Sequence, residues 1–149
     1  MDIRIPEDVI ATAESKRIAM ERAEQEEREA ERRWQEEVRE RSARMRPDVA
    51  FVVAWAKALT EKVTLPHLVS IVYRPKGRLH SGVFVEPDGR VCRTVGGNVG
   101  GMGGSQTWRG RDADDFARVD AEEDFRAERQ AIESGEVWDS IRKALAKGV

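Results

Sequence analysis

The chain has 149 residues, of which 40% are hydrophobic and 36% are charged, enough for one small and unusually polar domain. Its 26 basic and 28 acidic side chains nearly cancel, which argues against a purely electrostatic nucleic-acid binder and against an acidic mimic of DNA. A single cysteine excludes an internal disulfide and suits a reducing compartment.

The sequence predicts a soluble, cytoplasmic protein with no membrane segment. The N-terminus lacks the basic and apolar regions of a signal peptide. The most apolar segment, residues 49–59, is about half as long as a bilayer span requires. A composition rich in Arg, Ala and Glu is typical of a GC-rich bacterial or phage genome.

Residues 1–46 are predicted to form a charged helical arm. Pro6 followed by two acidic residues is typical of a helix start, and no Gly or Pro interrupts the sequence before Pro47. Segment 21–46 consists almost wholly of Glu, Arg, Gln and Ala, with several Glu and Arg residues paired at i,i+4. A helix this polar cannot be buried, so it must be solvated, pair along a narrow seam, or lie across a partner.

Apolar residues follow one line of this arm at spacings near those of a coiled-coil seam. They are Val9, Ala13, Met20, Ala23, Ala30, Trp34, Val38 and Met45. Lys16, Glu27 and Arg41 interrupt the seam, which predicts either a weak coiled coil or a solvated helix held at its two ends. Trp34 is costly to expose, so with Val38 it is expected to anchor a partner or to dock on the chain's own domain.

Residues 47–149 are predicted to form a small α+β core that starts with a helix. Pro47 ends the arm helix, and Asp48 caps the next one. The run 49–59 is apolar nearly all round, which predicts a largely buried helix.

Three β-branched segments predict an antiparallel meander in the middle of the chain. They are residues 67–73, 79–85 and 90–95. The Pro87-Asp88-Gly89 turn makes the last two a hairpin. A glycine-rich loop is expected at 96–105, after which residues 106–108 can begin a short fourth strand.

Two helices are predicted after the sheet. An acidic cap at Asp112 or Asp114 begins the first, which runs through Ile132 to the Ser134-Gly135 break, and the second starts at Glu136. The fold class is therefore α+β: a long charged N-terminal helix, a buried helix, a three- to four-stranded antiparallel meander and two C-terminal helices. The expected core consists of Phe51, Val52, Trp55, Leu59, Val69, Ile71, Tyr73, Val83, Val85, Val91, Trp138, Ile141 and Leu145.

No pair of titratable side chains has a spacing that predicts catalysis, and no cofactor or metal is expected. The hairpin register separates Cys92 from His80 by about 13 Å along the strands, too far for a thiol dyad, so Cys92 is interpreted as a small buried hydrophobe. His67 stands alone at a strand start. The acidic run from Asp112 lacks the fifth-position ligand and the sixth-position glycine of a calcium loop.

The glycine-rich segment is the one feature that resembles a ligand site. Glycines let backbone N–H groups approach a phosphate, although no Walker-type motif is present and acidic residues follow. With three nearby arginines, it predicts an alternative phosphate site formed by Arg93, Gly100, Gly101, Arg109 and Arg111. A flexible connector and a backbone surface for a partner chain are the other interpretations.

The sequence therefore favours a non-enzymatic interaction or assembly protein that presents a long charged helix. Its expected partner is a second copy of itself, another protein, or both. A module that binds a nucleotide or nucleic-acid phosphate is the alternative, so nucleic acid is a less favoured partner.

Overall fold

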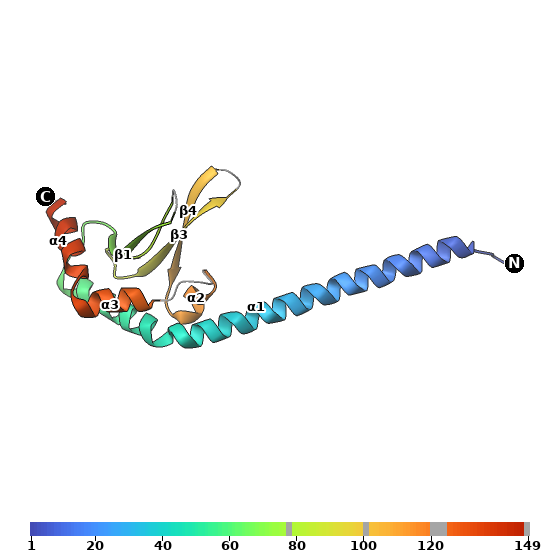
Figure 1. Cartoon of the computed structure of the whole chain (residues 1–149), viewed down its shortest axis with the longest axis horizontal. Coiled ribbons are helices and arrows are strands. Elements are labelled where there is room, and N and C mark those ends of the chain that lie inside the picture. Colours follow the sequence, from blue (N-terminus) through green and yellow to red (C-terminus); the bar gives the residue numbers. More distant parts are fainter. Residues whose placement is uncertain (77–78, 100–101, 120–124, 148–149) are drawn as a thin grey trace. The chain divides into compact units, whose positions relative to one another are not determined.

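The computed structural model describes residues 1–76, 79–99, 102–119 and 125–147 of the chain (Figure 1). The chain divides into two compact units, residues 1–37 (unit 1) and residues 38–149 (unit 2). Helix α1 (Glu7–Lys62) contributes residues to both units. The elements confirm the α+β class, with a long N-terminal helix, an antiparallel sheet and C-terminal helices.

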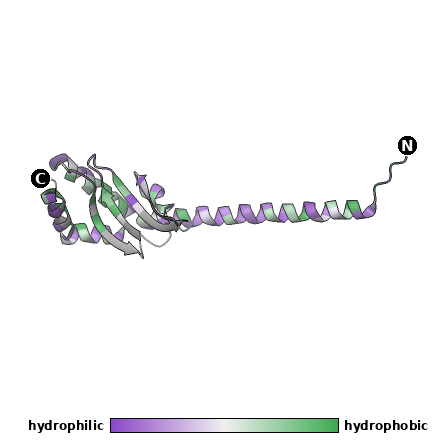
Figure 2. Cartoon of the chain, turned by 90° about the horizontal axis from the view of Figure 1, so that it is seen from above, coloured by the Kyte–Doolittle hydropathy of each residue, from purple (hydrophilic) through white to green (hydrophobic). Residues whose placement is uncertain are grey.

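Unit 1 is an exposed helix from residue 7 onward. Glu7 and Asp8 lie in its first turn, where negative charge complements the helix dipole. Every residue from 1 to 37 is exposed, and Figure 2 shows mostly hydrophilic colours along this part of α1. Arg17 donates to Glu14 and Glu21, three and four residues away, and this pairing raises the pKa of the Arg17 guanidinium. Local pairs of this kind support the helix where burial contributes little.

Helix α1 continues through Pro47 to Lys62, so the prediction that Pro47 ends the first helix is wrong. Proline inside a helix removes one hydrogen bond and costs about 3 kcal/mol. Met45 and Val49, on either side of it, are buried in the core of unit 2, and this burial holds the backbone helical. Ala43 and Pro47 are exposed, so water can reach the backbone where the hydrogen bond is lost.

Four antiparallel strands in sequence order form the sheet of the described residues, as the predicted meander requires. They are β1 (Val69–Lys76), β2 (Leu79–Val85), β3 (Val91–Val99) and β4 (Met102–Gly110). Phe84 pairs with Cys92, which is the register that the Pro-Asp-Gly turn predicts. Gly89 in that turn has a φ of +91°, a value that glycine adopts without steric cost.

Most of the segment predicted as a glycine-rich loop belongs to strands β3 and β4. Gly96 pairs with Ser105 and Gly97 with Gly104, so the loop prediction is wrong for these residues. Glycine weakens a strand through its backbone entropy, but it keeps the donor and the acceptor that the ladder needs. Gly100 and Gly101 lie outside the described residues.

Three helices follow the sheet in the described residues. They are α2 (Ala113–Ala117), α3 (Arg126–Ser134) and α4 (Val137–Lys147). Asp112 caps α2 by accepting a hydrogen bond from the backbone N–H of Asp115, which confirms one of the two predicted caps. Gly135 ends α3 with a φ of +83°, as the predicted Ser-Gly break requires.

The prediction of one helix from Asp112 through Ile132 is wrong, because α2 ends at Ala117. The break lets Phe116 and Phe125 pack against each other with ring centroids 4.8 Å apart. An unbroken helix would hold these two positions about 13 Å apart. Aromatic packing therefore outweighs the helical pattern of the sequence here.

The core of unit 2 lies between the helices and one face of the sheet. Predicted core residues confirmed as buried are Val52, Leu59, Val69, Ile71, Val83, Val85, Val91 and Ile141. Predicted core residues that are only partly buried or exposed are Phe51, Trp55, Trp138 and Leu145. The helices and Phe125, the residue before α3, add further core residues, which are Met45, Val49, Ala56, Phe116, Phe125, Ile132 and Val137. The side chain of Tyr73 lies outside the described part.

Unit 2 begins before residue 46, where the sequence suggests that the arm ends. Arg41 donates through Nη1 to the carbonyl of Ala117, and the Ser42 hydroxyl donates to the carboxylate of Asp114. Arg41, Ser42 and Met45 are all buried. The segment 38–46 therefore contributes to the folding of unit 2.

Candidate functional site

The sheet separates the arginines of the expected phosphate site. Arg93 pairs with Trp108 and Cys92 pairs with Arg109, so Arg93 and Arg109 lie on opposite faces of the sheet. Arg93 is 1% exposed, and its guanidinium carbon lies 5.2 Å from the ring centroid of Phe125. One phosphate ligand cannot contact both arginines.

At the end of β4 and the start of α2, the N–H donors that a phosphate would need already donate hydrogen bonds to carboxylates of the chain. Arg109 Nε donates to Glu86 Oε1 at 2.7 Å. The backbone N–H of Arg111 donates to Asp115 Oδ2 at 2.9 Å, and that of Asp115 donates to Asp112 Oδ1 at 3.1 Å. These negative charges stand where the dipole of α2 would otherwise favour an anion.

Cys92 is fully buried on β3, as predicted from the sequence. Burial, reinforced by the negative charge of Glu86, raises the pKa of its thiol to about 11. A thiol with this pKa stays protonated near neutral pH and is a poor nucleophile. Phe84, not His80, is the residue of β2 that pairs with Cys92, and His67 is exposed before β1. The structure brings none of these residues together as a catalytic pair.

The two residues of the expected partner-binding anchor lie one turn apart on α1 but differ in exposure. Trp34 belongs to unit 1 and is exposed. Val38 belongs to unit 2, where it is partly buried against the core. Trp34 therefore remains a candidate contact for a partner, whereas Val38 contributes to the packing of unit 2.

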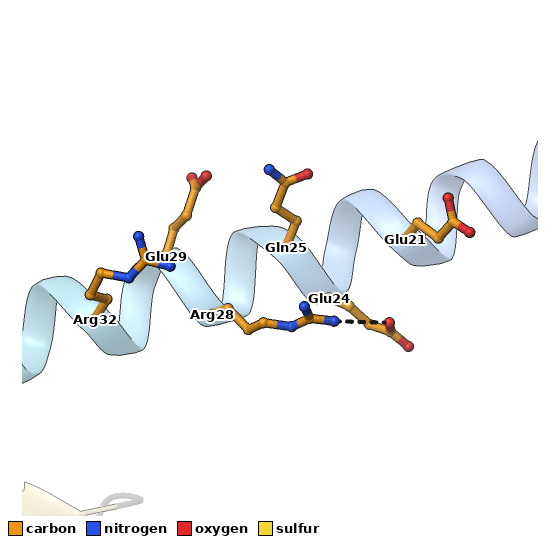
Figure 3. Close-up of a pocket in the computed structure, with 6 residues that line it drawn as sticks. All are labelled: Glu21, Glu24, Gln25, Arg28, Glu29 and Arg32. Carbon is orange, nitrogen blue, oxygen red and sulfur yellow. Dashed lines mark ion pairs between the residues drawn. The ribbon is translucent and has the colours of Figure 1, made fainter.

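One flank of α1 in unit 1 carries only charged and amide side chains (Figure 3). They are Glu21, Glu24, Gln25, Arg28, Glu29 and Arg32. Arg28 Nη2 and Glu24 Oε2 lie 3.6 Å apart across one helical turn, and both side chains are exposed. Such exposed pairs contribute a few tenths of a kcal/mol to the helix. This flank presents no apolar side chain to a ligand.

Another side of the same helix exposes large apolar side chains. Val9, Met20 and Trp34 are 52%, 65% and 44% exposed. At about 100° per residue, the three lie within roughly 40° of one another around the helix axis. Met45 and Val49 continue in the same phase and are buried in unit 2. This side of α1 thus carries apolar side chains that are buried in unit 2 and exposed in unit 1, where Lys16 and Glu27 interrupt them and the exposed Ile10 and Ile18 lie off the line.

Unit 2 has an apolar groove between the last turns of α1 and the start of α4. It is lined by Trp55, Ala58, Leu59, Lys62, Val63 and Trp138 and has a volume of about 230 Å³. The rings of Trp55 and Trp138 meet edge to face, with centroids 5.9 Å apart and planes at 62°. A groove of this size is smaller than most small-molecule sites and fits a protruding apolar side chain.

Sequence reasoning missed this groove because it assigned both tryptophans to the core. The angular position of Trp138 around the axis of α4 distinguishes it from the buried residues of that helix. Val137, Ile141 and Ala144 form the buried stripe of α4, and Trp138 lies about 100° from Val137 around the axis. Trp138 is accordingly 39% exposed.

Metal, membrane and family comparisons add no further site. Within residues 1–76, 79–99, 102–119 and 125–147, no group of three or more His, Cys, Asp or Glu side chains is placed to hold a metal ion. None of the helices in that part of the chain has both the length and the apolar composition that crossing a bilayer requires. No protein-family model matches the sequence, and comparisons with curated proteins and with solved structures give no match.

Proposed function

We propose that this chain is a non-enzymatic assembly protein that binds a second copy of itself, or another protein, through the helix of unit 1. The exposed apolar line of Val9, Met20 and Trp34 carries the proposal. Isolated exposed hydrophobic residues are ordinary, but large ones that share one side of a charged helix mark an interaction surface. Burying them in a partner contributes about 25 cal/mol per Å² of apolar area.

The composition of the line supports weak, reversible pairing. Alanines at positions 13, 23 and 30 let two helices approach closely but bury little apolar area. Lys16 and Glu27 interrupt the line with charge, which weakens a seam and restricts the registers that it can adopt. The groove at Trp55 and Trp138 supplies a second apolar surface that suits a different protein partner.

Sedimentation of the full chain over a range of micromolar concentrations tests the proposal. We expect reversible association that Met20→Glu and Trp34→Glu each weaken, because each places a charge in the line. Gln25→Glu adds the same charge on the opposite side of the helix and should leave association unchanged. A wild-type chain that stays monomeric at high micromolar concentration contradicts self-association and leaves only a different protein as partner.

A further inference from the structure

Opposite charges and complementary sizes are arranged symmetrically along the apolar line of unit 1. The midpoint lies between Glu21 and Arg22, and four pairs of positions are equidistant from it. The pairs are Val9 with Trp34, Ala13 with Ala30, Lys16 with Glu27, and Met20 with Ala23. All eight residues lie in the helical and exposed part of α1.

We infer that two copies of the chain pair through this line as antiparallel helices, with Lys16 of each copy facing Glu27 of the other. This inference rests on the proposed self-association and names its partner and its register. The spacing assigns positions 13, 20, 27 and 34 to one seam row and positions 9, 16, 23 and 30 to the other. In an antiparallel pair the two rows face each other, so each of the four pairs meets across the seam.

In the antiparallel register, the two charged residues that interrupt the line lie opposite each other and can form ion pairs. Lys16 and Glu27 would form two equivalent ion pairs related by the twofold axis of the dimer. A larger side chain also faces a smaller one where Met20 meets Ala23 and where Trp34 meets Val9, which suits close packing. Next to the seam, the register brings Arg17, which pairs with Glu14 and Glu21 of its own helix, near the oppositely charged Glu24 of the second copy.

Parallel pairing would place charged residues of the seam opposite residues of the same charge. Each seam position would then face its own copy, so Lys16 would meet Lys16 and Glu27 would meet Glu27. Like charges juxtaposed in an interface oppose association strongly. Beside the seam, Glu26 of one helix would also approach Glu31 of the other. Charge complementarity therefore selects a second copy in the antiparallel orientation.

A charge-swap series on the full chain tests the register. Lys16→Glu alone and Glu27→Lys alone should each weaken association roughly tenfold or more, because each creates two like-charge contacts. The double variant should restore wild-type affinity. Arg22→Glu and Glu29→Lys make the same charge changes away from the seam and should have little effect.

A crosslink gives a second readout, which reports the orientation of the two helices and not only the strength of their association. In a Cys92→Ala background, an equimolar mixture of Val9→Cys and Trp34→Cys chains should form a disulfide-linked dimer on mild oxidation, whereas Val9→Cys alone should not.

The outcomes separate this inference from the proposed function. If the wild type associates but the double variant fails to recover, or if Val9→Cys crosslinks to itself, the antiparallel register is wrong and self-association stands. If the wild type does not associate at all, proposed self-association and register are both overturned.

Discussion

Gly110 at the end of β4 and Phe116 in α2 approach so closely that only glycine fits between the strand and the helix. A Cβ atom on Gly110 would lie 2.7 Å from Cε2 of Phe116 and 3.0 Å from Cβ of Asp115. Phe116 in turn packs against Phe125, whose ring lies under the guanidinium of Arg93. This contact therefore helps to set the aromatic cluster at one end of the core.

Replacing Gly110 with alanine should destabilise unit 2 by about 1–3 kcal/mol, because the added methyl overpacks the Phe116 ring. Urea unfolding followed by circular dichroism measures the loss. Phe116→Leu removes ring atoms from the contact, so the two substitutions together should cost less than the sum of their separate costs. Strict additivity in this double-mutant cycle would show that the contact is not the cause.

Arg93 and Arg109 should differ sharply in their contribution to stability. Arg93→Ala removes a large, fully buried side chain and its contact with Phe125, so we expect a loss of about 2–5 kcal/mol, as for other large-to-alanine changes in a core. Arg109→Ala removes an ion pair whose arginine is 55% exposed, which contributes about 1 kcal/mol or less. Chemical denaturation of the two variants under identical conditions compares these losses.

The alternative phosphate site can be tested without disturbing the core. Arg109→Ala and Arg111→Ala change exposed side chains. Arg93→Ala is left out because Arg93 is buried, so a loss of binding in that variant would not be distinguishable from a loss of stability. We expect no measurable affinity of the wild type for ATP or for a single-stranded oligonucleotide in an isothermal titration at low salt. Micromolar binding that falls steeply with salt and is lost in the Arg109/Arg111 double variant would instead support a phosphate-binding module.

Local signals in the sequence were enough to predict the first two strands and the start of the third, but not the rest of β3 or most of β4. The β-branched runs and the Pro87-Asp88-Gly89 turn specify the hairpin and its register without reference to the rest of the chain. The continuation of α1 through Pro47 could not be predicted in this way. It depends on the burial of Met45 and Val49, which is a tertiary effect.

The separation of the arginines in the expected phosphate site was harder to predict, because it depends on how the strands pair across the sheet. Reading 96–105 as a loop hides the β3–β4 register that puts Arg93 and Arg109 on opposite faces. The sequence left open whether Trp34 docks on the chain's own domain, and the structure places it exposed on α1. The partial burial of Val38 could not be predicted, because it depends on where unit 2 begins.

Cys92 should make unit 2 less stable at alkaline pH. The folded state raises the thiol pKa from its ordinary value of 9.0 to about 11, so the folded chain holds a proton that the unfolded chain releases. The stabilisation is complete below about pH 9 and is lost as pH rises through 11, by up to about 2–3 kcal/mol. Unfolding free energies of wild type and Cys92→Ala between pH 7 and pH 11 isolate this effect from other titrations. Parallel pH dependences of the two proteins would contradict it.

Two N-terminal deletions should separate the helix of unit 1 from the folding of unit 2. Removing residues 1–37 takes away only exposed side chains, so the remaining chain should unfold cooperatively with a Tm close to that of the full chain at a concentration where both are monomeric.

Removing residues 1–46 also deletes Met45, which is fully buried, and the hydrogen bonds that Arg41 and Ser42 make to Ala117 and Asp114. A buried methionine contributes about 2–5 kcal/mol, and each hydrogen bond adds roughly 1 kcal/mol. This sum approaches the 5–15 kcal/mol that typically holds a whole domain together, so we expect the shorter chain to melt far earlier or without cooperativity. Thermal unfolding scans of the two deletion variants compare their Tm values and test this expectation. Equal Tm values would show that residues 38–46 contribute nothing to unit 2.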